Sequence, residues 1–315
     1  MELVIDKANV LSFLSHKDSA AIFECSRLIK RGIQLCFNFN KDDITSSSGD
    51  GNRILMWLRT MTQGCKTKLP KWEPRIDSSN LKTNFSTSLT PKQKRDAYLL
   101  DNNDVIPKIQ EKGAILIGCV GQEIELILSL NLEDTEISAL KISSWADYCP
   151  KLPLTDIIIC DNHFFNDKYV YDQNKDELIK GLSQLPNNSP VNCIIIVKIG
   201  EIDREIDLEE EAKNIKNSLK NITGSKKSSV TIIGTYSTHD RNAITNYYRL
   251  KNGSCFHLIN NGLKEDVTAE IKTHANITNE ERSNQLIEVY QKIIDNWNEK
   301  NIYGDKISNF LKFPD

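Results

Sequence analysis

Residues 191–236, VNCIIIVKIGEIDREIDLEEEAKNIKNSLKNITGSKKSSVTIIGTY, decide the fold class of this chain. The stretch begins and ends with near-continuous apolar runs, CIIIV and VTIIG, which have the length of buried strands. Between them lies a charged segment, 208–222, whose apolar residues recur at helical spacing. A strand, a helix and a second strand in this order form a unit of a parallel sheet. The sequence therefore predicts an α/β fold.

The segments on either side of this stretch continue the alternation of strands and helices. An apolar strand, DIIIC (156–160), and a helical segment, KDELIKGLSQL (175–185), precede it. An amphipathic helix is expected at 278–300, with Thr278 and Glu281 in the spacing of a capping box. We therefore expect a largely parallel sheet with helices on both faces.

A hairpin is expected between the last of these strands and the final helix. Two β-rich segments, 242–250 and 254–259, flank Asn252 and Gly253. An Asn-Gly pair between two strands is a strong signal for a tight turn. The sequence therefore places a hairpin turn at Asn252-Gly253.

The first half of the chain predicts a smaller α/β domain. Its expected strands are 1–5, 33–39 and 114–120, and its expected helices are 8–29, 53–61 and 121–130. Two prolines in SSWADYCPKLP (143–153) then interrupt the pattern. The sequence thus predicts two domains, residues 1–148 and residues 149–315.

Composition limits the classes of protein to which the chain can belong. It has 315 residues, 39% of them hydrophobic, which is enough for two packed domains. No apolar run is long enough to cross a bilayer, and MELVIDK lacks the basic start of a signal peptide. We therefore expect a cytoplasmic protein without a membrane span. The formal net charge of −3 gives no global attraction for nucleic acid, so any such binding must come from a local patch.

The cysteines argue against both a metal site and disulfides. All eight are scattered, no two form a C-x-x-C pair, and several lie in apolar runs. This pattern is typical of reduced, buried thiols. We expect no metal and no cofactor.

The stretch STHDRNAITNYYRLKNGSCF (237–256) contains the strongest functional signal. It directly follows a strand, and open α/β sheets bind ligands beyond the carboxyl ends of their strands. Measured from His239, Arg241 lies at +2, Asn246 at +7, Gly253 at +14 and Ser254 at +15. An imidazole can attack phosphorus while a cation offsets the developing charge. We expect His239, Arg241, Asn246 and Ser254 to converge on one pocket, with Gly253 beside them.

This spacing resembles the phospholipase D superfamily motif, in which histidine, lysine at +2 and aspartate at +7 precede a Gly-Ser pair. Arg241 stands at the lysine position and Asn246 at the aspartate position, so the motif is degenerate. His-Asp-Arg with an asparagine at this offset is similar to the phospholipase-D-like C-terminal domain of proteins with microtubule-interacting and trafficking domains. Those domains are regarded as binding modules. The resemblance covers about residues 150–300 and implies a phospholipase D-like fold there.

Three functions remain open on these grounds. The first is recognition of a phosphodiester, above all nucleic acid, with little or no cleavage, since Asn246 cannot act as a base whereas Arg241 still binds phosphate. The second is an active metal-independent nuclease. Active members of the superfamily use two facing copies of the motif, so this requires a homodimer in which two His239 residues meet. The third is a protein-interaction module with a vestigial site. The Lys-, Asn- and Ile-rich composition suggests a low-GC genome, and by association a role in bacterial antiviral defence.

A basic stretch in the first half has two interpretations. Between residues 66 and 95 it is rich in cations and also contains Trp72, and the cations nearest its start are Lys66, Lys68, Lys71 and Arg75. A solvated loop is the simpler interpretation. The alternative is extra contacts with a phosphate backbone.

The opening VIDKANVL resembles the start of PIN-type ribonucleases, where a strand ends in an aspartate that binds Mg²⁺. Asn9 is displaced by one position from the pattern of that family. Oxygen ligands would come from Asp6 together with Asp42, Asp101 or Asp104. An aspartate between a strand and a helix is also an ordinary N-cap.

Plain structural roles compete with the functional ones. His-Asp-Arg after a strand can simply cap a turn, with Asp240 accepting from backbone amides. His163, after Asp161, can line the same crevice, although a turn role is favoured. The acidic series from Glu201 to Glu211 is interpreted as the solvated start of a helix, because acidic residues favour a first turn.

Overall fold

The computed structural model describes residues 2–15, 29, 33–45, 49–62, 70–73, 97–99, 115–118, 134–140, 144–150, 152, 154–182, 190–236, 241–253, 256–260, 263–264, 267–296 and 301–314. The chain divides into two compact units. The N-terminal unit comprises residues 1–132 with 274–280, and the C-terminal unit comprises residues 133–273 with 281–315. Residues 133–148, which the sequence grouped with the first domain, belong to the second unit.

The described strands of the N-terminal unit form one sheet with parallel pairings throughout. They are β1 (Glu2–Ile5), β2 (Gln34–Phe37), β3 (Lys71–Trp72), β4 (Ala97–Leu99) and β5 (Ile115–Gly118), in the order β3-β2-β1-β4-β5. The described helices are α1 (Lys7–Ser15), α3 (Asp42–Thr45) and α4 (Asp50–Thr62). The predicted strands and the helix at 53–61 are confirmed. Of the helix expected at 8–29, α1 accounts for the start, and the one expected at 121–130 lies outside the described residues.

The C-terminal unit contains an eight-stranded sheet. Its order is β15-β9-β8-β7-β10-β11-β14-β6. The strands are β6 (Thr135–Leu140), β7 (Asp156–Cys160), β8 (Asn192–Lys198), β9 (Ser229–Thr235), β10 (Asn242–Thr245), β11 (Tyr248–Asn252), β14 (Val267–Thr273) and β15 (Ile302–Gly304). The central β7, β8 and β9 are parallel, as the sequence predicts. Antiparallel strands extend the sheet on both sides, so it is mixed rather than parallel throughout.

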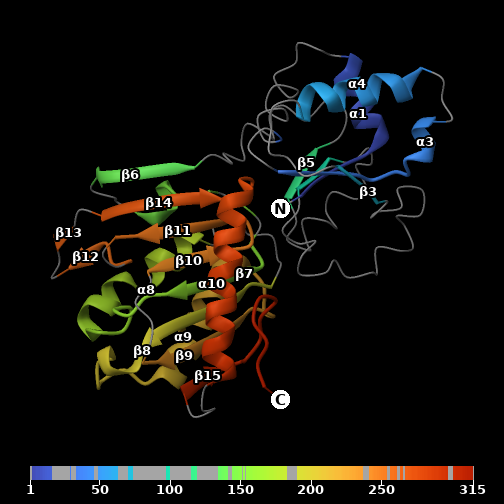
Figure 1. Cartoon of the computed structure of the whole chain (residues 1–315). Coiled ribbons are helices and arrows are strands. Elements are labelled where there is room, and N and C mark those ends of the chain that lie inside the picture. The colour runs from blue at the N-terminus through green and yellow to red at the C-terminus, as the bar shows by residue number, and fades with distance from the viewer. Residues whose placement is uncertain are drawn as a thin grey trace. The chain divides into compact units, whose positions relative to one another are not determined.

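Helices cover the central strands of this sheet. They are α8 (Lys168–Leu182), α9 (Leu208–Thr223) and α10 (Ile277–Asp295), with short 3₁₀ helices η3 (Trp145–Asp147) and η4 (Ile199–Glu201). Leu286 and Tyr290 of α10 pack in one core cluster with Ile194 of β8, and Figure 1 shows α10 in front of the strands. The alternate residues of β7, such as Ile159, are equally buried. They face the other side, where α8 and α9 contact each other. The expected α/β arrangement, a sheet with helices on both faces, is therefore confirmed.

The hairpin turn lies elsewhere than the sequence predicts. β10 and β11 form the hairpin, and Asn246 and Tyr247 form its turn. Thr245 Oγ1 accepts hydrogen bonds from the backbone N of Tyr247 and Tyr248 at 3.1 and 3.0 Å, which stabilises this turn. Asn252 instead lies inside the sheet, opposite Ala269 of β14. The predicted turn at Asn252-Gly253 is therefore wrong. A short separate hairpin, β12 (Ile259–Asn260) with β13 (Leu263–Lys264), follows β11.

The N-terminus of α10 is also capped differently from the prediction. Asn276 Oδ1 accepts from the backbone N of Thr278 at 3.0 Å, so Asn276 takes the capping role assigned to Thr278. By contrast, the acidic series does begin a helix, as expected, and the structure adds that Asp207 caps α9 by accepting from the backbone N of Glu209 and Glu210. Among the residues that the structure describes, no helix has the length and apolar character needed to span a membrane.

Candidate functional site

The carboxyl edge of the C-terminal sheet gathers polar side chains from neighbouring strands. β7, β8 and β9 end at this edge, β10 begins there and β11 ends beside it. The order in which the chain adds strands to the sheet changes direction at β7, since β8 and β9 lie on one side of β7 and β10 lies on the other. Open α/β sheets bind ligands at such a position. We define the carboxyl edge as residues 161–163, 198–201, 236, 241–242 and 251–253.

Arg241 and Gly253, two of the predicted site residues, meet at this edge. Arg241 precedes β10, and its Nη1 donates to the carbonyl oxygen of Gly253, after β11, at 3.3 Å. The backbone fixes both positions, because Asn252 N donates to Arg241 O and Gly253 N donates to Thr268 O, each at 3.2 Å. Within the described part of the chain, the buried Nε of Arg241 has no hydrogen-bond acceptor. The contact with Gly253 thus holds the guanidinium in place, and it uses one of the five N–H donors that an arginine side chain carries.

A buried carboxylate, Asp161, ties the segment after β11 to the end of β7. Asp161 is fully buried, and its Oδ2 accepts from Phe256 N at 3.0 Å. Its Oδ1 accepts from His163 N at 2.9 Å. Trp145 Nε1 in turn donates to Phe256 O at 3.0 Å. Both backbone polar groups of Phe256 are therefore paired, which fixes Phe256 beside the end of β7. The sequence assigned no role to Asp161, because an aspartate after a strand is an ordinary turn residue.

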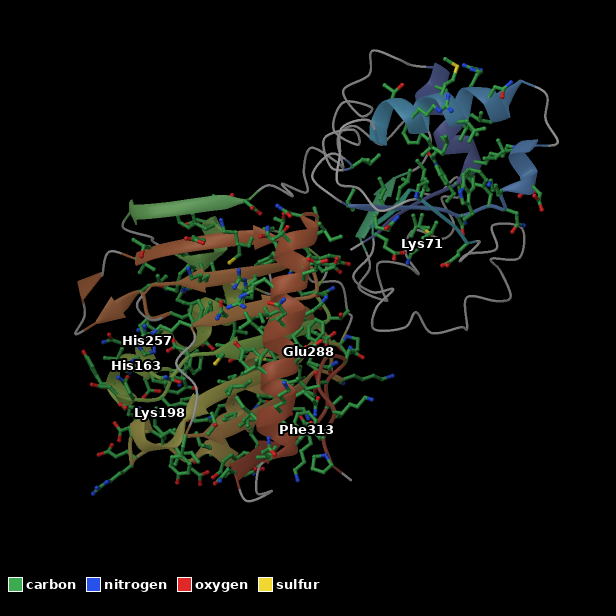
Figure 2. All side chains as sticks on the ribbon, viewed as in Figure 1. Lys71, His163, Lys198, His257, Glu288 and Phe313 are labelled. Carbon is green, nitrogen blue, oxygen red and sulfur yellow. The ribbon has the colours of Figure 1, made fainter. Side chains whose placement is uncertain are left out.

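His163 and Lys198 lie at the ends of the two neighbouring strands β7 and β8. Lys198 Nζ pairs with Glu201 Oε1 at 3.0 Å. This hydrogen bond and the charge of Lys198 lower the pKa of the Glu201 carboxyl group, and nearby His163 acts in the same direction. Figure 2 shows His163, Lys198 and His257 on the same side of the unit, and the ring of His257 contacts that of Phe164. His163 thus lies at the end of β7, where its backbone N donates to Asp161 Oδ1 and its Nδ1 lies 3.4 Å from Asn166 Nδ2, which is the favoured turn role.

Asn246 does not join this group. It follows β10, whose residue Thr245 pairs with Ile157 at the start of β7, so Asn246 lies at the opposite edge of the sheet. There it is buried, and its Oδ1 accepts from Thr155 N at 3.2 Å. Five residues of extended chain separate it from Arg241 by about 17 Å. The expected convergence of Asn246 with Arg241 on one pocket is therefore wrong.

Several predicted site residues lie outside the described residues. These are His239, Ser254, Lys66, Lys68 and Arg75. Lys71 is described, and its Nζ pairs with Glu2 Oε1 at 2.6 Å, bridging β3 and β1. The Glu2 side chain is only 7% exposed, so this ion pair compensates a buried charge. Lys71 thus has a structural partner in the N-terminal unit.

Asp6, the aspartate that carries the PIN-type resemblance, lies at the carboxyl edge of the N-terminal sheet. Asp6 follows the central strand β1, and its Oδ1 accepts from Asn38 Nδ2, after β2, at 2.7 Å. Asn9 is fully buried, and Asp42 is exposed in α3. Asp101 and Asp104 lie outside the described residues. In the described ranges, no group of three or more His, Cys, Asp or Glu side chains is placed to hold a metal ion.

Comparison with known proteins adds no family. No protein-family model matches the chain, and no curated protein matches it either.

Proposed function

We propose that the C-terminal unit binds a phosphodiester, in the form of nucleic acid, at its carboxyl edge without efficient cleavage. The main support is the guanidinium of Arg241, fixed through Gly253 at the position where α/β sheets bind ligands. Arginine can bind two phosphate oxygens at once and stays charged at all physiological pH values. The net charge of −3 makes such a local cation necessary.

The surroundings of Arg241 favour binding over turnover. A nucleophilic imidazole needs a partner that orients it, and loss of proton-transfer help costs about 10²- to 10⁴-fold in rate. Asn246, the expected partner, lies at the opposite edge. Asp161 is the buried carboxylate at this edge, and it accepts from two backbone N–H groups. Both carboxylate oxygens of Asp161 therefore hold backbone N–H groups of the fold in place.

A titration of labelled single- and double-stranded DNA and RNA at low salt tests this proposal. Arg241→Gln should weaken binding by about 10-fold or more, since a hydrogen bond to a charged group contributes about 1.5–3 kcal/mol. Arg282→Gln is the matched control. It removes the same charge from an exposed position on α10, where Nη1 bonds only to a neighbouring glutamine among the described contacts. Equal affinity of the wild type and Arg241→Gln would contradict the proposal.

The two other functions predict different results in the same experiment. Cleavage that resists EDTA and disappears in His239→Ala would show a metal-independent nuclease. Absence of binding to every nucleic acid at low salt would favour a protein-interaction module.

A further inference from the structure

The carboxyl edge carries an exposed aromatic side chain as well as cations. Tyr236 follows the last residue of β9 and is 65% exposed. Its neighbour Thr235 pairs in register with Lys198, the last residue of β8. Along the edge the order is then Tyr236, Lys198, His163 and Arg241, from β9 to β10. Three strand spacings of about 4.8 Å put Tyr236 about 14 Å from Arg241. The row is therefore longer than one phosphate group.

A protein that binds single strands combines cations for the phosphates with aromatic rings for the bases. Stacking on an exposed ring requires an unpaired base, because a duplex hides its base faces within the stack. Tyr236 is a surface residue, 65% exposed, so a base can approach it from solvent.

Acidic residues beside the edge disfavour a wider ligand. The loop after β8 continues into Asp203 and Glu205, and Asp203 Oδ2 accepts from Lys168 N at the start of α8. The side chain of Glu205 is 77% exposed. Like charges repel, so a ligand whose phosphates extend beyond the row toward these carboxylates is disfavoured.

We infer that the ligand at the carboxyl edge is single-stranded nucleic acid, with a phosphate at Arg241 and an unpaired base stacked on the ring of Tyr236. This inference rests on the proposed function and adds the substrate class to it. Lys198 and His163 lie between the two contacts, so the strand crosses the ends of β8 and β7.

Three probes separate the contribution of the phosphates from that of the unpaired base. They are a short thymine oligonucleotide, an abasic strand of the same length, and a duplex of the same length. The wild type should bind the thymine strand more tightly than the duplex. Tyr236→Ala should weaken binding of the thymine strand by about 5- to 150-fold, the effect of one stacked base, and leave the affinity for the abasic strand unchanged. Tyr236→Phe keeps the ring and should keep the affinity.

Tyr169→Ala is the matched control. Tyr169 is 61% exposed in the first turn of α8, next to the residue that bonds Asp203, and its loss should leave all three affinities unchanged. The inference would be overturned if Tyr236→Ala bound the thymine strand as tightly as the wild type does, or if the wild type bound strand and duplex equally. In either case, binding that still depends on Arg241 would uphold the proposed function. Absence of Arg241-dependent binding to all three probes would overturn both.

Discussion

Asn246 supports the β10–β11 turn from inside the protein. It is 1% exposed, and its Oδ1 accepts from the backbone N of Thr155, just before β7. Asn246→Ala leaves that N–H without its acceptor, which should lower the free energy of unfolding by about 1–3 kcal/mol. Because the site is at the other edge, affinity for nucleic acid should stay within about twofold of the wild type. Urea unfolding and an oligonucleotide titration measure the two effects. If Asn246→Ala had the stability of the wild type but did not bind nucleic acid, Asn246 would belong to the binding site after all.

The place of Asn246 shows what a spacing motif can predict. The motif consists of an offset of seven residues from His239 to Asn246 and a cation, Arg241, at +2. Whether two motif positions meet in space depends on the conformation of the residues between them. Here β10 is extended and carries Asn246 to the far edge, while the pairing of β11 brings Gly253 back to Arg241. That pairing is a long-range property, which local sequence does not specify.

At the level of elements, α9 shows a helix whose ends are set by its own sequence. Asp207 caps its N-terminus, and Gly224 ends it with a φ of 73°. Asp207→Ala should therefore lower the free energy of unfolding by about 1 kcal/mol. Glu210→Gln, an exposed change in the same first turn, is the control and should cost less. Equal losses for the two variants in chemical denaturation would argue that charge, rather than the cap, stabilises the helix start.

Elements with strong local signals were predictable, and those defined by their partners were not. The central strands β7, β8 and β9 are near-continuous apolar runs, and α9 has a clear cap and period, so their type and order follow from sequence. β15 has only three residues, and it exists because Ile302 pairs with Ile233. The prediction of a turn at Asn252-Gly253 fails because this pair, like β15, is defined by its partner. The pairing of Asn252 with β14 outweighs its turn preference.

The whole C-terminal unit should lose stability at alkaline pH. Burial raises the pKa of the Cys149 and Cys193 thiols from the ordinary value of 9.0 to about 12. Between these values the unfolded chain releases thiol protons that the folded chain retains, so the free energy of unfolding falls as pH rises. Burial also raises the pKa of Tyr248, which acts in the same direction. Urea unfolding at neutral pH and at about pH 10.5 should show the loss, and Cys193→Val should reduce its dependence on pH. A flat or rising profile would contradict this account.

The salt dependence of nucleic-acid affinity tests the central claim for the molecule most directly. Each phosphate neutralised by a protein cation releases condensed counterions, which contributes about 0.7 to the slope of log K against log salt for a single strand. The wild type should show a negative slope with a thymine strand, and Arg241→Gln should show one that is shallower by about 0.7. Arg282→Gln should match the wild type. Parallel plots for the wild type and Arg241→Gln would mean that Arg241 does not contact a phosphate, and would contradict the account.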